Sequence, residues 1–120
     1  MSPQPALAAF PAILLLESGP TLRLALAKAL RRHRYLVLEA QDVPKAIDLV
    51  KVHSRRIHLL LMGLSFDDTV ATTIKQYRPN LHVLRVTGSR MQPTREGVLT
   101  LESASEMVRQ FFATADGTEF

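Results

Sequence analysis

The sequence contains no cysteine, which excludes disulfides and thiol chemistry and fits a reducing compartment. Long apolar runs are also missing. Stretches such as Ala12–Leu16 and Leu59–Met62 are far too short to cross a bilayer. Residues 1–11 lack the basic start and the long apolar run of a signal peptide. We therefore expect a cytoplasmic protein with no membrane partner.

Familiar catalytic motifs are missing as well. There is no nucleophile elbow, no P-loop and no dinucleotide fingerprint, and the spacing of His33, His53, His58 and His82 matches no metal motif. His58 and His82 flank neighbouring strands and could approach each other in space, although we favour strand-edge histidines over a metal site. We expect no enzymatic activity, no cofactor and no bound metal.

The chain does have the means to form a core. Its 120 residues are 47% apolar and 22% charged, values typical of one globular domain. Residues 1–11 contain three prolines and are predicted to be a flexible leader. We assign residues 12–113 to the domain and residues 114–120 to a disordered tail.

Short apolar runs alternate with helical patterns along the domain. Strands are expected at 12–16, 35–40, 57–62, 81–86 and 98–101. Gly19 and Pro20 open the first helix, Asp42 caps the second, and Asp67 or Asp68 caps a short third helix with Val70, Ile74 and Tyr77 facing inward. Ser103 and Glu106 have the capping-box spacing of a final helix.

Strands that are apolar on both faces predict a parallel sheet covered by helices on both sides. Five such units fit an α/β, flavodoxin-like (CheY-like), doubly wound fold with strand order 2-1-3-4-5. The short intervals after residues 63 and 87 predict shortened third and fourth helices. In such sheets, sites form at the carboxyl ends of the strands.

Four segments, 12–20, 30–40, 57–63 and 78–88, resemble the receiver domain of two-component response regulators. In that family, two acidic residues after the first strand help to bind magnesium, and an aspartate at the end of the third strand accepts a phosphoryl group. A hydroxyl after the fourth strand and a lysine after the fifth strand then contact the phosphate. The resemblance implies a role in bacterial phosphorelay signalling.

The matching positions in this sequence are Glu17, Ser18, Gly63, Thr87 and Leu101. Only Glu17 and Thr87 keep the expected chemistry. Gly63, at the phospho-acceptor position, has no side chain to phosphorylate, and an acyl phosphate requires a carboxylate. The resemblance therefore implies a degenerate pseudo-receiver that is not phosphorylated. We expect it to act by protein–protein contact with a histidine kinase or an output protein, with a homodimer as a further option.

The net charge of +4 leaves a second hypothesis open, that of a basic protein binding a polyanion or nucleic acid. The candidate contacts are five arginines near helix ends: Arg31, Arg32, Arg34, Arg55 and Arg56. Cations at helix ends also complement the helix dipole, which is the simpler explanation. No aromatic residues alternate with these arginines, so we rank nucleic acid below a protein partner.

Overall fold

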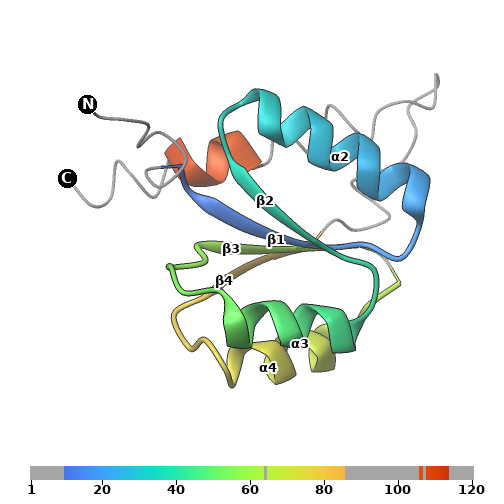
Figure 1. Ribbon diagram of the computed structural model, residues 1–120, viewed down its shortest axis with the longest axis vertical. Helices are drawn as coiled ribbons and strands as arrows, with labels where there is room; N and C mark the ends of the chain where they lie inside the picture. Colours follow the sequence, from blue (N-terminus) through green and yellow to red (C-terminus); the bar gives the residue numbers. More distant parts are fainter. Residues whose placement is uncertain (1–9, 64, 86–105, 107, 114–120) are drawn as a thin grey trace.

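The computed structural model describes residues 10–63, 65–85, 106 and 108–113 (Figure 1). Four strands form one parallel sheet in the order β2-β1-β3-β4. They are β1 (Ala12–Leu16), β2 (Leu36–Ala40), β3 (Leu59–Met62) and β4 (His82–Arg85). The order agrees with the first four strands of the predicted topology. The predicted fifth strand at 98–101 and the predicted fourth helix lie outside the described residues.

Helices cover both faces of the sheet. Figure 1 shows α2 (Pro20–Arg32) and the helical segment at 108–113 on one side, with α3 (Val43–Val52) and α4 (Asp68–Lys75) on the other. With eight residues, α4 confirms the prediction of a short third helix. In the part of the chain that is described, no helix combines the length and the apolar character needed to span a membrane.

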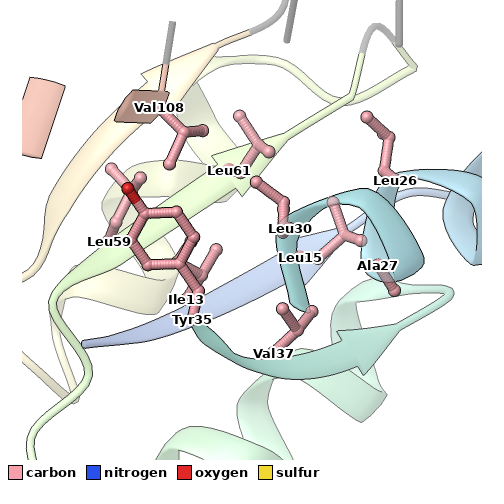
Figure 2. Close-up of a cluster of buried hydrophobic side chains, with 10 residues drawn as sticks. All are labelled: Ile13, Leu15, Leu26, Ala27, Leu30, Tyr35, Val37, Leu59, Leu61 and Val108. Atoms are coloured by element: carbon pink, nitrogen blue, oxygen red, sulfur yellow. The ribbon is translucent and has the colours of Figure 1, made fainter. Parts of the chain in front are cut away.

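The core lies in two layers because successive strand residues point to opposite faces. All five residues of β1 and all four of β3 are buried. Ile13, Leu15, Leu59 and Leu61 pack beneath α2 and Val108, as Figure 2 shows. Leu14, Leu16, Leu60 and Met62 form the opposite layer, beneath α3 and α4. The uninterrupted apolar runs in the sequence reflect this double burial.

Local signals set the helix starts as predicted. Pro20 occupies the first turn of α2, where a missing N–H costs little. The Asp42 carboxylate accepts from the Lys45 N–H at 3.0 Å, and the Asp67 carboxylate accepts from the Thr69 N–H at 3.1 Å. Asp67 rather than Asp68 is therefore the cap of α4.

Three strand starts and one side-chain orientation need correction. The second, third and fourth strands begin at Leu36, Leu59 and His82, later than the predicted starts at 35, 57 and 81. Tyr77 does not face inward but is 46% exposed. The apolar spacing from Val70 continues through Tyr77, but α4 ends at Lys75, so the periodic pattern outruns the helix.

Backbone hydrogen bonds close the end of α2, although no glycine is present there. The N–H of Tyr35 donates to the carbonyl of Leu30 at 3.4 Å, and the N–H of Arg34 donates to that of Arg31 at 3.0 Å. This is the Schellman arrangement, whose left-handed residue is usually glycine. Here that residue is Arg34, with φ of 67°.

Candidate functional site at the carboxyl edge of the sheet

Strand register brings the predicted site residues together. Leu16 pairs with Met62, and Met62 pairs with Arg85, so these three strand ends form one edge. Glu17 and Gly63 follow directly, and the Gly63 N–H donates to the carbonyl of Leu16 at 2.9 Å. The structure therefore places the first acidic position beside the phospho-acceptor position, as the resemblance implies.

The Glu17 side chain turns toward Gly63. Among the described residues, Glu17 is the charged residue that is buried, with an exposure of 8%. Its Oε2 accepts a hydrogen bond from the Gly19 N–H at 2.8 Å. A Cβ atom added at Gly63 would overlap Oε1 of Glu17 and lie 3.1 Å from its Cδ. The space in which a side chain at position 63 would begin is therefore filled by the Glu17 carboxylate.

Three further contacts link the segments around this site. Ser18 Oγ lies 3.0 Å from Ser65 Oγ, which links the loops after β1 and β3. Arg23 Nη1 donates to the carbonyl oxygen of Glu17 at 3.0 Å, and Arg23 Nε lies 3.5 Å from Glu39 Oε1. Ser18 is thus part of a loop-to-loop contact, and α2 is tied to the strand end that carries Glu17.

Sequence reasoning missed the role of Arg85. Its Nη1 lies 2.9 Å from Asp68 Oδ1, and its Nη2 donates to the carbonyl of Phe66 at 2.6 Å. Arg85 thereby anchors the loop before α4 to the end of β4. The sequence signal for this role was Arg85 itself, a cation at the end of a largely apolar strand and next to the predicted site.

Asp67 and Asp68 are both occupied by these structural contacts. Asp67 caps α4, and Asp68 pairs with Arg85. Both support the interpretation of this pair as part of the helix start rather than as a replacement acceptor. Thr87 and Leu101, the remaining predicted site positions, lie outside the described residues.

The predicted arginine cluster is divided in the structure. Arg31 is engaged, because its Nη1 lies 3.1 Å from Glu39 Oε2 and its Nη2 donates to the carbonyl of Val37 at 2.9 Å. Arg34 and Arg56 instead line one pocket at the amino-terminal edge of the sheet, whereas Arg32 and Arg55 are exposed outside it. The five arginines therefore differ in their surroundings, and their role in binding a polyanion stays a prediction.

Comparison with known proteins identifies the fold. No family model matches the chain, and no curated protein matches it. Among solved structures, the receiver domain of the hybrid histidine kinase CckA is 22% identical with a TM-score of 0.59; the alignment covers 82% of this chain and 96% of that domain. The response regulator TrrA from Thermotoga maritima, solved with Mg²⁺ and beryllofluoride, is 16% identical with a TM-score of 0.62, covering 84% and 98%.

A de novo designed Rossmann-fold protein is also similar, at 14% identity and a TM-score of 0.51, with 85% of this chain and 96% of the design covered. The chain is thus similar to receiver domains over nearly their whole length. That likeness defines the fold, and because the same fold also occurs in a designed protein, function must be argued from the site.

The donor set found here is poor for a magnesium ion such as the one present in the TrrA structure. Magnesium is usually bound through one or two carboxylates together with phosphate oxygens and waters. At this edge one oxygen of Glu17 is already bonded to Gly19, and Asp67 and Asp68 are engaged by the Thr69 N–H and by Arg85. Among the described residues, no three histidine or acidic side chains gather closely enough to hold a metal.

Proposed function

We propose that this chain is a receiver-like signalling module that accepts no phosphoryl group and acts by binding a signalling protein. One observation carries the proposal: the Glu17 carboxylate fills the space beside Gly63 in which an acceptor side chain would begin. The similarity to receiver domains supports the signalling context, and the contacts of Glu17 argue against phosphoryl chemistry.

Glu17 is a poor substitute for the missing acceptor. Forming an acyl phosphate requires a carboxylate oxygen that can attack phosphorus while a cation neutralises the phosphate. Glu17 is buried, and its Oε2 is held by the Gly19 N–H. Among the described residues, no group of three acidic or histidine side chains forms around it to bind the cation.

Without phosphorylation, the conformation at this edge is fixed by contacts within the chain. The Ser18–Ser65 contact and the Arg85–Asp68 pair hold the loops in a single arrangement. Signal output then depends on whether a partner, either a histidine kinase or an output protein, is bound. We infer that the affinity for this partner is insensitive to phosphoryl donors.

A phosphorylation assay tests the first half of the proposal. The purified chain and the CckA receiver are incubated separately with acetyl phosphate and Mg²⁺, and each is analysed by intact mass spectrometry. We expect the mass of this chain to stay unchanged while the CckA receiver, as the positive control, gains one phosphoryl group. Stoichiometric labelling of a side chain next to Gly63 would overturn the proposal.

A binding assay tests the second half. The cytoplasmic part of each histidine kinase and each output protein from the same organism is titrated against the chain by isothermal calorimetry, with and without beryllofluoride and Mg²⁺. We expect one kinase or one output protein to bind with the same affinity under both conditions. A change in affinity on adding beryllofluoride, or no binding to any of these proteins, would contradict the proposed role.

A further inference from the structure

A pocket of about 460 Å³ opens at the amino-terminal edge of the sheet, opposite Glu17 and Gly63. Strand pairing builds it, because His82 pairs with Leu59 while Ala12 pairs with Leu36. His58 and Tyr35 directly precede these strands and therefore lie along the same edge. The pocket volume falls within the range of about 300–1,000 Å³ typical of small-molecule sites.

Aromatic rings form one wall of the pocket. The Tyr35 and Phe112 rings are stacked, with centroids 5.1 Å apart and planes 27° apart. Phe111 meets Phe112 edge-on at 5.2 Å, and His82 lies 5.4 Å from Phe111. The His58 ring is oriented by the Ala12 N–H, which donates to its Nδ1 at 3.1 Å. Tyr35 is buried, so the accessible ring surface of this wall belongs to the partly exposed Phe111 and Phe112, which offer an apolar surface to a planar ligand.

The remaining lining is cationic. Arg34 and Arg56 both line the pocket and are exposed, and neither forms an ion pair or a side-chain hydrogen bond with any described residue. No acidic side chain from the described part of the chain lines the pocket. Two unpaired guanidinium groups beside aromatic rings favour a ligand that carries both a negative charge and a ring.

The end of α2 sets the position of Arg34. Its φ of 67° is the left-handed conformation of the Schellman helix end, where glycine is the usual residue. The chain instead has an arginine at this position, and that arginine lines the pocket.

We propose that this pocket binds a small aromatic anion of mononucleotide size, with the ring against the partly exposed Phe111 and Phe112 and the anionic group at Arg34 and Arg56. The anionic group can be the phosphate of a nucleotide or the carboxylate of an aromatic acid. This site is separate from the Gly63 edge and does not depend on the proposed signalling role.

Nuclear magnetic resonance titrations of the full chain test the proposal. The probes are adenosine 5′-monophosphate, guanosine 5′-monophosphate, 2-naphthoate, adenosine and inorganic phosphate. We expect at least one ring-bearing anion to shift the amide signals of Tyr35, His58 and His82. Adenosine and phosphate, which each lack one half of the ligand, should bind at least about tenfold more weakly, equivalent to 1.4 kcal/mol.

The probes also distinguish the two sources of negative charge. Preference for the nucleotides indicates a phosphate ligand, whereas preference for 2-naphthoate indicates an aromatic carboxylate. The proposal is overturned if no ring-bearing anion shifts these signals at millimolar concentration, or if inorganic phosphate alone binds as well as the nucleotides.

Three variants separate specific binding from charge attraction. Arg34→Gly should reduce affinity at least tenfold while its urea midpoint stays equal to that of the parent chain or rises, because glycine accepts the left-handed backbone. Arg56→Gln should also reduce affinity. Arg32→Gln removes the same charge from a residue outside the pocket lining and should leave affinity unchanged. Equal losses in Arg56→Gln and Arg32→Gln would show nonspecific attraction and refute the site.

Discussion

Glu17 Oε2 accepts a hydrogen bond from Gly19 while Oε1 of the same carboxylate occupies the space next to Gly63. Glu17 and Gly63 are complementary, because the Glu17 carboxylate occupies the space that a side chain at position 63 would need. The φ of Gly63 is not in the left-handed region, so the restriction at this position concerns space and not backbone conformation. This relationship leads to the first prediction.

Gly63→Asp should destabilise the fold by about 1–3 kcal/mol, because the new side chain and Glu17 compete for one space. Combining it with Glu17→Ala should relieve the clash, giving a favourable coupling of about 0.5–3 kcal/mol in a double-mutant cycle. Urea unfolding measures all four proteins. Ser54→Asp adds the same charge at an exposed position whose side chain has no hydrogen bond or ion pair with a described residue, and it should change stability by less than about 0.5 kcal/mol. Additive effects of the two substitutions would show that the residues are independent.

Arg78 joins the end of α3 to the segment after α4. Its guanidinium donates to the carbonyls of Val50 at 3.0 Å and Arg55 at 2.8 Å, and also to the carbonyl of His53. Arg78→Met should therefore lower the free energy of unfolding by about 1.5–3 kcal/mol. Arg78→Lys should not restore it, because one ammonium group lacks the fork that reaches several acceptors.

The control for Arg78 is Arg109. Arg109 pairs with Glu106 at 2.7 Å on an exposed surface, and such pairs contribute about 0–1 kcal/mol. Thermal or urea unfolding of Arg109→Met should show a much smaller loss than that of Arg78→Met. Equal losses in the two variants would show that the carbonyl contacts of Arg78 are not a special source of stability.

His53 should make stability depend on pH. Burial lowers the pKa of His53 below its ordinary value of 6.5, and the charges of Arg78 and Arg55 lower it further. The unfolded chain then binds a proton more readily than the folded chain, so stability is complete above about pH 6.5 and decreases as the pH falls through that value. Its Nε2 is buried with no partner among the described residues.

Urea midpoints measured at pH 7.5 and pH 5.5 test this linkage. The urea midpoint of the parent chain should be lower at pH 5.5 than at pH 7.5. This decrease should be smaller in His53→Gln. An identical pH dependence in both proteins would show that another group is responsible.

Asp42 should stabilise α3 through its cap. Asp42→Ala removes the acceptor for the Lys45 N–H and should cost about 0.5–2 kcal/mol. Asp48→Ala removes the same charge from an exposed position inside α3 and serves as the matched control in urea unfolding. A loss in Asp48→Ala as large as that in Asp42→Ala would contradict a capping role.

Much of the fold was predictable because its signals are local. The apolar runs around Ile13 and Leu60 indicated strands that are buried on both faces. Asp42 and Pro20 indicated where helices start. The error at Tyr77 arose because the apolar periodicity continues past Lys75, and the nearest stop signal, Pro79, lies four residues beyond the end of α4. The end of α2 had no glycine signal either, because Arg34 takes the left-handed position.

The candidate site was predictable only in part. For a lone carboxylate at a strand end, the sequence leaves open whether it is solvated or accepts a local N–H bond, and in the structure Glu17 accepts from the Gly19 N–H. That the same carboxylate fills the space beside Gly63 depends on the register of β1 and β3, which no single segment encodes. The pocket near Arg34 was missed for the same reason, because its lining comes from segments far apart in the chain.

The complete burial of β1 between two helical layers has a consequence for amide exchange with solvent. Ile13, Leu14 and Leu15 pair with strands on both sides and have no exposed surface. Their amide hydrogens can then exchange with deuterium only when the whole domain opens. The exchange rates of these three residues therefore measure the global free energy of unfolding. Faster exchange at either edge of the sheet would then measure local opening.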